Sequence, residues 1–130
     1  MSVSARNWAW DIKQRPRLSS DPPPKPHEDP KVMQLPPGEK LTLLCIAEHE
    51  SAVEGCAYPS YQRIAEQTGL NVRTVQRHVK VLAAVHAFRI EKQRRQGGQW
   101  FSHMYFFENI PDEYREQDKA WMAQRGGRAA

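Results

Sequence analysis

Polar side chains that suit nucleic-acid recognition are concentrated in the middle of the chain. Two arginines, a lysine and two neutral hydrogen-bonding residues occur within eight positions: Arg73, Thr74, Gln76, Arg77 and Lys80. Lysine and arginine bind phosphate oxygens, and arginine and glutamine also form paired hydrogen bonds with base edges. No Asp or Glu occurs from 71 to 90. We expect Gln76, Arg77 and Arg73 to read bases and Thr74 and Lys80 to hold phosphates.

These side chains need two helices joined by a tight turn to position them, and the surrounding sequence has that pattern. Ser60 suits the cap of a first helix, Gly69 suits its left-handed end, and Asn71 can cap a second helix. A buried stripe with spacings of three, four and three follows: Val72, Val75, Val79 and Leu82. The pattern predicts a helix-turn-helix with a recognition helix at 71–84. A helical hairpin with a solvated basic face is the alternative, which the acid-free face and the turn disfavour.

A β-wing is predicted after the recognition helix, over residues 88–107. From 88 to 93 the side chains alternate between two faces, with Phe88, Ile90 and Lys92 on one and Arg89, Glu91 and Gln93 on the other. A basic tip with two glycines occupies 93–99, and an aromatic stretch from 100 to 107 returns. Cations on such a tip suit the DNA backbone or the minor groove, and those expected to contact DNA are Lys92, Arg94 and Arg95. A solvated tip is the alternative. Four residues near the starts of the two helices complete the candidate DNA contacts: Ser60, Tyr61 and Gln62 in the first helix and Asn71 in the second.

The charge distribution agrees with this placement. The chain of 130 residues has a formal net charge of +4 and suits one domain with tails. Residues 71–99 hold seven Lys and Arg against one acid, whereas residues 38–70 hold two against five. No apolar run is long enough for a membrane span, and the first residues form no apolar leader, so we expect a cytoplasmic protein without membrane contact.

The segments on either side of residues 38–110 are predicted to be separate additions. Residues 16–37 contain eight of the ten prolines, so the segment 1–37 is expected to include an extended linker or strap. Trp8 and Trp10 are expected to pack against the domain. A helix from Pro111, ending at Gly126, with a flexible tail is expected in 111–130. This helix either packs on the tryptophans or forms a dimer contact.

Catalysis and metal binding have no support in the sequence. Cys45 and Cys56 are too few for a disulfide framework, and with His49 they lack an obvious fourth ligand, so buried free thiols are expected. No phosphate-binding glycine loop and no nucleophile–base arrangement has persuasive spacing. We therefore expect no enzyme activity, no metal and no cofactor.

A set of short motifs occurs in a characteristic order: Trp8-Ala9-Trp10, the apolar helix 40–49, Tyr58-Pro59-Ser60, Thr68-Gly69-Leu70, Arg73-Thr74-Val75 and Ser102-His103-Met104-Tyr105. In this order the chain resembles a winged helix-turn-helix family common in phages and mobile elements of bacteria. The resemblance implies a mainly α fold with a small β-wing (α+β), here with an N-terminal Pro-rich extension and an extra C-terminal helix. His86 stands where the family tends to have glycine.

The function that the resemblance implies is sequence-specific binding of double-stranded DNA. Members act as transcriptional regulators or as DNA-binding parts of replication initiators, in a bacterial cell or a phage-infected host. The expected function is a transcriptional regulator that forms a homodimer through its C-terminal helix or N-terminal segment. A replication or recombination accessory protein and a protein-binding winged-helix adaptor remain alternatives.

Overall fold

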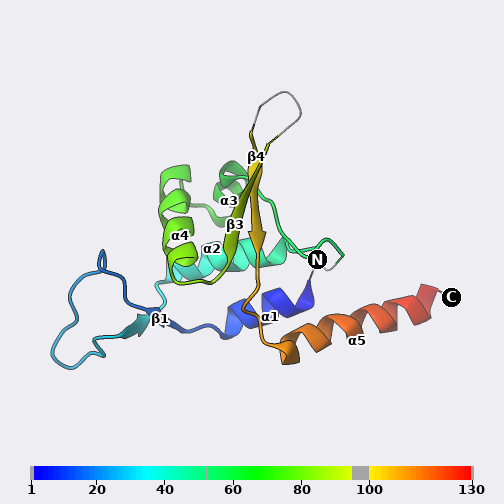
Figure 1. The fold of residues 1–130 in the computed structure, drawn as a ribbon, viewed down its shortest axis with the longest axis horizontal. Coiled ribbons are helices and arrows are strands. Elements are labelled where there is room, and N and C mark those ends of the chain that lie inside the picture. The colour runs from blue at the N-terminus through cyan, green and yellow to red at the C-terminus, as the bar shows by residue number, and fades with distance from the viewer. Residues whose placement is uncertain (1, 52, 95–99, 130) are drawn as a thin grey trace.

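The computed structural model of the protein describes residues 2–51, 53–94 and 100–129. These residues form helices and two antiparallel strand pairs (Figure 1). In chain order the elements are α1 (Val3–Asp11), β1 (Gln14–Pro16), β2 (Val32–Gln34), α2 (Pro37–Glu48), α3 (Tyr61–Thr68), α4 (Val72–Ala84), β3 (Arg89–Arg94), β4 (Trp100–Phe106) and α5 (Asp112–Ala129). The predicted fold class, a mainly α winged helix-turn-helix with a small β-wing, is confirmed.

Helix α2 is the centre of the hydrophobic core, as the sequence predicts. Leu43, Ile46 and Ala47 are at most 1% exposed, because this helix is apolar over a wide arc and has neighbours on several sides. Helices α1, α3 and α4 all pack on it. The helix begins at Pro37. The first N–H of a helix has no partner within the helix, so a proline at this position costs no hydrogen bond.

Side-chain caps and one left-handed residue fix the helix-turn-helix. The Ser60 hydroxyl accepts a hydrogen bond from the Arg63 backbone N–H at 3.0 Å. Gly69 has φ of 79° and ends α3, and the Asn71 side chain then accepts from the Thr74 N–H at 2.8 Å. The predicted caps and turn are thereby confirmed. The buried stripe is confirmed for Val75, Val79 and Leu82, which are at most 1% exposed, while Val72 is half-buried.

The wing is an antiparallel hairpin of β3 and β4 (Figure 1). Its register runs from Arg89 opposite Phe106 to Arg94 opposite Trp100, with an irregularity between Lys92 and Arg94. The backbone of Tyr105 exchanges two hydrogen bonds with Ala57, at 3.0 and 2.7 Å, which joins the wing to the loop after α2. Residues 95–99 of the predicted tip, including Arg95, lie outside the described residues.

His86 takes the left-handed conformation, with φ of 62°, in the turn from α4 into the wing. The Asn109 side chain donates to the His86 carbonyl at 2.8 Å, and the Ala87 N–H reaches back to the Leu82 carbonyl at 2.9 Å. These bonds hold a backbone conformation that a residue with a Cβ adopts at a cost of about 1–2 kcal/mol.

Replacing His86 with glycine is expected to raise the free energy of unfolding by roughly 0.5–1 kcal/mol. Glycine removes the left-handed strain, although it also loosens the unfolded chain and so offsets part of the gain. Urea denaturation followed by circular dichroism measures the change. Ala120→Gly is the control, because it lies in the middle of α5 and should destabilise instead. A destabilised His86→Gly variant would contradict the strain argument.

The proline-rich segment is a strap whose ends pair as β1 and β2. Arg15 on β1 is 4% exposed, and its guanidinium donates to Glu39 on α2 at 2.7 Å and to Asp21 in the loop at 2.8 Å. The hydrogen bonds from Arg15 and from the Leu18 N–H lower the pKa of Asp21 to about 2. The loop between β1 and β2 projects from the body (Figure 1), and the Arg15 ion pairs hold its base against α2.

The stability that Asp21 provides should disappear in acid. Its folded-state pKa is depressed, so its contribution, roughly 2 kcal/mol, is present above pH 4 and is lost as the pH falls towards 2. The urea midpoint of the wild type should therefore fall over that range by more than that of Asp21→Asn. If the urea midpoints of the two proteins fell equally over that pH range, the ion pair of Asp21 would not contribute to stability.

Trp8 and Trp10 have different environments. Trp8 is 8% exposed and meets the ring of Phe107 edge-on at 5.9 Å, as expected, but Trp10 is 59% exposed, so its predicted burial is wrong. In α1 two residues that are two positions apart point to opposite sides, and only one of them can face the core.

Helix α5 packs on α1 at the end of the molecule opposite the wing (Figure 1). Arg115 donates to the fully buried carboxylate of Glu50 at 2.6 and 3.0 Å, and Asp118 accepts from the Ser4 backbone N–H at 2.9 Å. The predicted end of this helix at Gly126 is wrong, since α5 continues to Ala129. A glycine inside a helix costs only about 1 kcal/mol, which neighbouring helical residues can offset.

Candidate nucleic-acid interface

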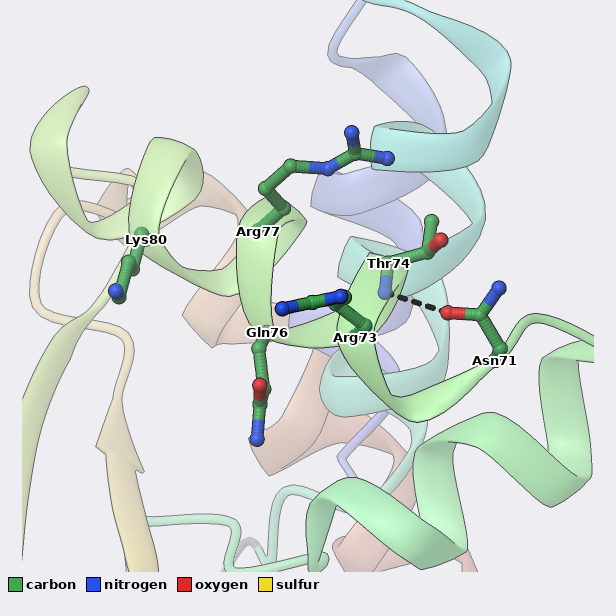
Figure 2. A pocket seen from close by; sticks show the side chains of 6 residues that line it. All are labelled: Asn71, Arg73, Thr74, Gln76, Arg77 and Lys80. Carbon is green, nitrogen blue, oxygen red and sulfur yellow. Dashed lines mark hydrogen bonds between the residues drawn. The ribbon is translucent and has the colours of Figure 1, made fainter.

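The exposed face of α4 and its N-cap form a shallow concavity of about 440 Å³. All six residues predicted for this helix line it, as Figure 2 shows: Asn71, Arg73, Thr74, Gln76, Arg77 and Lys80. The opposite side of the same helix holds Val75 and Val79, at 0% and 1% exposure. Burial of that stripe against the core fixes which face of α4 meets the solvent.

The side chains of this face point in different directions (Figure 2). Arg73 lies at the centre, Gln76 and Arg77 extend to opposite sides, and Lys80 lies one turn further along. Within the described part of the chain no acid forms an ion pair with Arg73, Arg77 or Lys80. Their positive charge is therefore open to an anionic partner.

Asn71 and Thr74 have a structural part in this surface. The Asn71 side-chain oxygen is occupied by the Thr74 N–H, which leaves the Asn71 amide group exposed at the edge. The Thr74 side chain is half-buried on the flank of the helix. Both residues belong to the concavity, with the cap fixing where α4 begins.

The three predicted residues at the start of α3 do not line the concavity. The Ser60 hydroxyl caps α3, and the Tyr61 hydroxyl is 3.1 Å from Nδ1 of His103 on β4. Gln62 is exposed and donates to Glu66 at 3.3 Å. The Tyr61 contact connects the start of α3 with the wing, and the Ser60 cap fixes where α3 begins, so both residues help to position the interface.

The predicted cations of the wing are described in part. Lys92 is exposed and lies opposite His103 in the hairpin. Arg94 ends β3, and Arg95 lies outside the described residues. Sequence reasoning assigned no role to His103, whose pKa is lowered by burial and by the nearby Lys92. Its contact with Tyr61 spans 42 residues, and no local pattern signals such a pairing.

His78 sets the distance between α4 and α2. Thr42 donates to the Gly38 carbonyl at 2.9 Å, and its oxygen is 3.1 Å from Nδ1 of His78, which must then be the donor. A Cβ on Gly38 would lie 2.8 Å from the imidazole ring, so the two helices approach closely here. Burial lowers the pKa of His78, in keeping with a ring that packs between α2 and α4.

The two cysteines of the chain are buried free thiols. Cys45 and Cys56 are free and buried, as predicted, and burial raises the pKa of each thiol. Among the described residues, His, Cys, Asp and Glu form no group of three or more that could hold a metal ion. None of the helices described has the length and apolar character that crossing a membrane requires.

Comparison with known protein families gives a match for the central part of the chain. Residues 34–84 match a family model described as a helix-turn-helix domain. The matched region contains α2, α3, the turn and α4, which together carry the concavity. The wing and the two outer helices lie outside it. No curated protein and no solved structure was found to match the chain.

Proposed function

We propose that this protein binds double-stranded DNA sequence-specifically and regulates transcription. The observation that carries the proposal is the acid-free, cation-rich face of α4 on a domain that matches the helix-turn-helix family. Helix α4 enters the major groove, and the wing lies on the backbone or in the minor groove. The setting in a phage or mobile element rests on the sequence resemblance. That setting, the cytoplasmic location and the homodimer remain predictions.

The major groove suits the chemistry of this face. The groove is about 12 Å wide and admits one helix, with phosphates as walls and base edges as floor. Arg73 and Arg77 are four residues apart and project from the side opposite Val75, so they reach the floor. Gln76 reads bases at one flank, while Thr74 and Lys80 contact phosphates. An arginine pairs best with guanine, and a glutamine with adenine.

The direct test is to select a preferred duplex from random DNA and measure its affinity by fluorescence anisotropy over a salt series. The selected site should be bound about 10³-fold or more tightly than scrambled DNA. The logarithm of the binding constant should fall linearly with the logarithm of the salt concentration. A protein-binding adaptor would show no salt-dependent affinity for DNA, and that result would end the proposal.

Changing Arg94 and Arg95 to alanine should weaken specific and non-specific DNA binding about equally. Cations at a hairpin tip suit phosphates, and each lost phosphate contact reduces the salt slope by about 0.9, so we expect a loss of roughly two units. The control is the double variant Lys13→Ala/Lys119→Ala. It removes the same amount of charge from two exposed positions, one just before β1 and one on α5. An unchanged slope with lost site preference would mean that the wing reads bases or groove width.

A further inference from the structure

A second concavity, of about 540 Å³, lies between the end of α1, the outer face of α2 and the end of α3. Its lining includes Trp10, Leu41, Leu44, Glu48 and Gln67, and none of its lining residues comes from α4. This cleft is therefore separate from the candidate DNA interface. Its volume falls within the range of about 300–1,000 Å³ that is usual for small-molecule sites.

Large apolar side chains form one wall of the cleft and are exposed to solvent. Trp10 is 59% and Leu41 is 41% exposed, whereas Leu44 below them is 9% exposed. The backbone beside Trp10 is held, because the Lys40 ammonium donates to the carbonyls of Trp10 and Ile12, at 2.6 Å each. The same ammonium lies 5.9 Å from the centre of the Trp10 ring. Because the backbone at Trp10 is held, its exposed indole offers a surface on which a second aromatic ring can stack.

The polar side of the cleft is also ordered, and it carries negative charge. The Gln67 side-chain oxygen accepts from the Cys45 thiol at 3.2 Å and is 2.7 Å from Nε2 of His49, which fixes the amide. Glu48 lines the cleft, is exposed, and forms no hydrogen bond or ion pair with any residue that the structure describes. Lys40 donates to the two carbonyls and does not line the cleft, and no cation among the described residues forms an ion pair with Glu48. The Glu48 carboxylate is therefore left for a cation.

We propose that this cleft binds a small aromatic molecule that carries a cationic group. The aromatic ring lies against Trp10 and Leu41, and the cation pairs with the Glu48 carboxylate. An indole face attracts cations as well as apolar rings, so both parts of the molecule are favoured at this wall. The proposal rests on the cleft alone and is independent of DNA binding.

The test compares two probes with the same ring and opposite charge, tryptamine and indole-3-propionate. Each is titrated into the full chain labelled with ¹⁵N, and amide and indole resonances are followed by NMR. Tryptamine should shift the Trp10, Leu41 and Gln67 signals saturably, and indole-3-propionate should bind roughly tenfold more weakly. Glu48→Gln should remove the preference between the probes, and Trp10→Ala should weaken both. Tyr58→Ala removes an aromatic residue that is 54% exposed outside the cleft and should change nothing.

Three results would overturn the proposal. They are equal affinity for both probes, shifts without saturation, and shifts centred away from the cleft. If the same signals move on concentrating the protein without a probe, the cleft accommodates a second copy instead. Glu48 is exposed, so Glu48→Gln keeps the test decisive even if Trp10→Ala fails to fold.

Discussion

Alanine at Arg73 or at Arg77 is expected to weaken binding to the preferred DNA site by about 1–3 kcal/mol for each change, or roughly 5- to 150-fold. Both guanidinium groups lie on the exposed face of α4, and no described acid neutralises them. In the groove each can donate two hydrogen bonds to one guanine, a geometry that alanine cannot replace. Fluorescence anisotropy with the selected duplex and with scrambled DNA measures the two affinities.

The loss should be greater for the selected duplex than for scrambled DNA, because base contacts determine the sequence preference. Arg63→Ala is the matched control: it removes the same kind of charge from an exposed position on α3 that does not line the concavity. It should leave the ratio of the two affinities unchanged. If Arg73→Ala and Arg77→Ala both bind the selected site like the wild type, α4 is not the recognition helix.

Changing Arg115 to methionine is expected to lower the free energy of unfolding by about 3–5 kcal/mol. The Glu50 carboxylate is 0% exposed and has Arg115 as its ion-pair partner at 2.6 Å. Methionine keeps the apolar stem but leaves a buried charge without a cation. It also removes a donor from the Phe107 carbonyl, at 2.8 Å. Urea denaturation near pH 7 measures the change.

Two further variants test the cause of that loss. Lys119→Met removes a side chain that is 78% exposed and 3.8 Å from Glu116, and its stability should match the wild type, because water screens such pairs. Adding Glu50→Gln to Arg115→Met should recover part of the stability, since the buried group is then neutral. A loss below about 1 kcal/mol in Arg115→Met would show that Glu50 is solvated in the folded protein.

Much of the central fold could be predicted because its determinants are local. The Ser60 and Asn71 caps reach three residues along the chain, and Gly69 needs only its own backbone freedom. The apolar stripe of α4 follows from helical periodicity, and that stripe also determines which cations are exposed. Hence the face lined by Arg73 and Arg77 was already defined by the sequence pattern.

The remaining features depend on contacts between distant residues, which no short pattern contains. Arg15 meets Glu39 across 24 residues and Arg115 meets Glu50 across 65, so neither buried ion pair was foreseen. The different exposures of Trp8 and Trp10 depend on where α2 and α5 lie relative to α1. In the candidate site, the sequence suggested Tyr61 as a DNA contact but could not predict the position of its side chain. Its partner His103 is on the returning strand of the wing, 42 residues away.

The pairing of α1 with α5 also affects the order of folding. The bond from the Ser4 N–H to Asp118 joins residues 114 positions apart, and closing such a loop costs about 4 kcal/mol of chain entropy plus a constant. Helices α3 and α4 need no such closure, so they can assemble on α2 first. During synthesis the ribosome releases α1 long before α5. A nascent chain can therefore hold a finished helix-turn-helix while the buried face of α1 still lacks the cover of α5, which makes that face a target for chaperones and proteases.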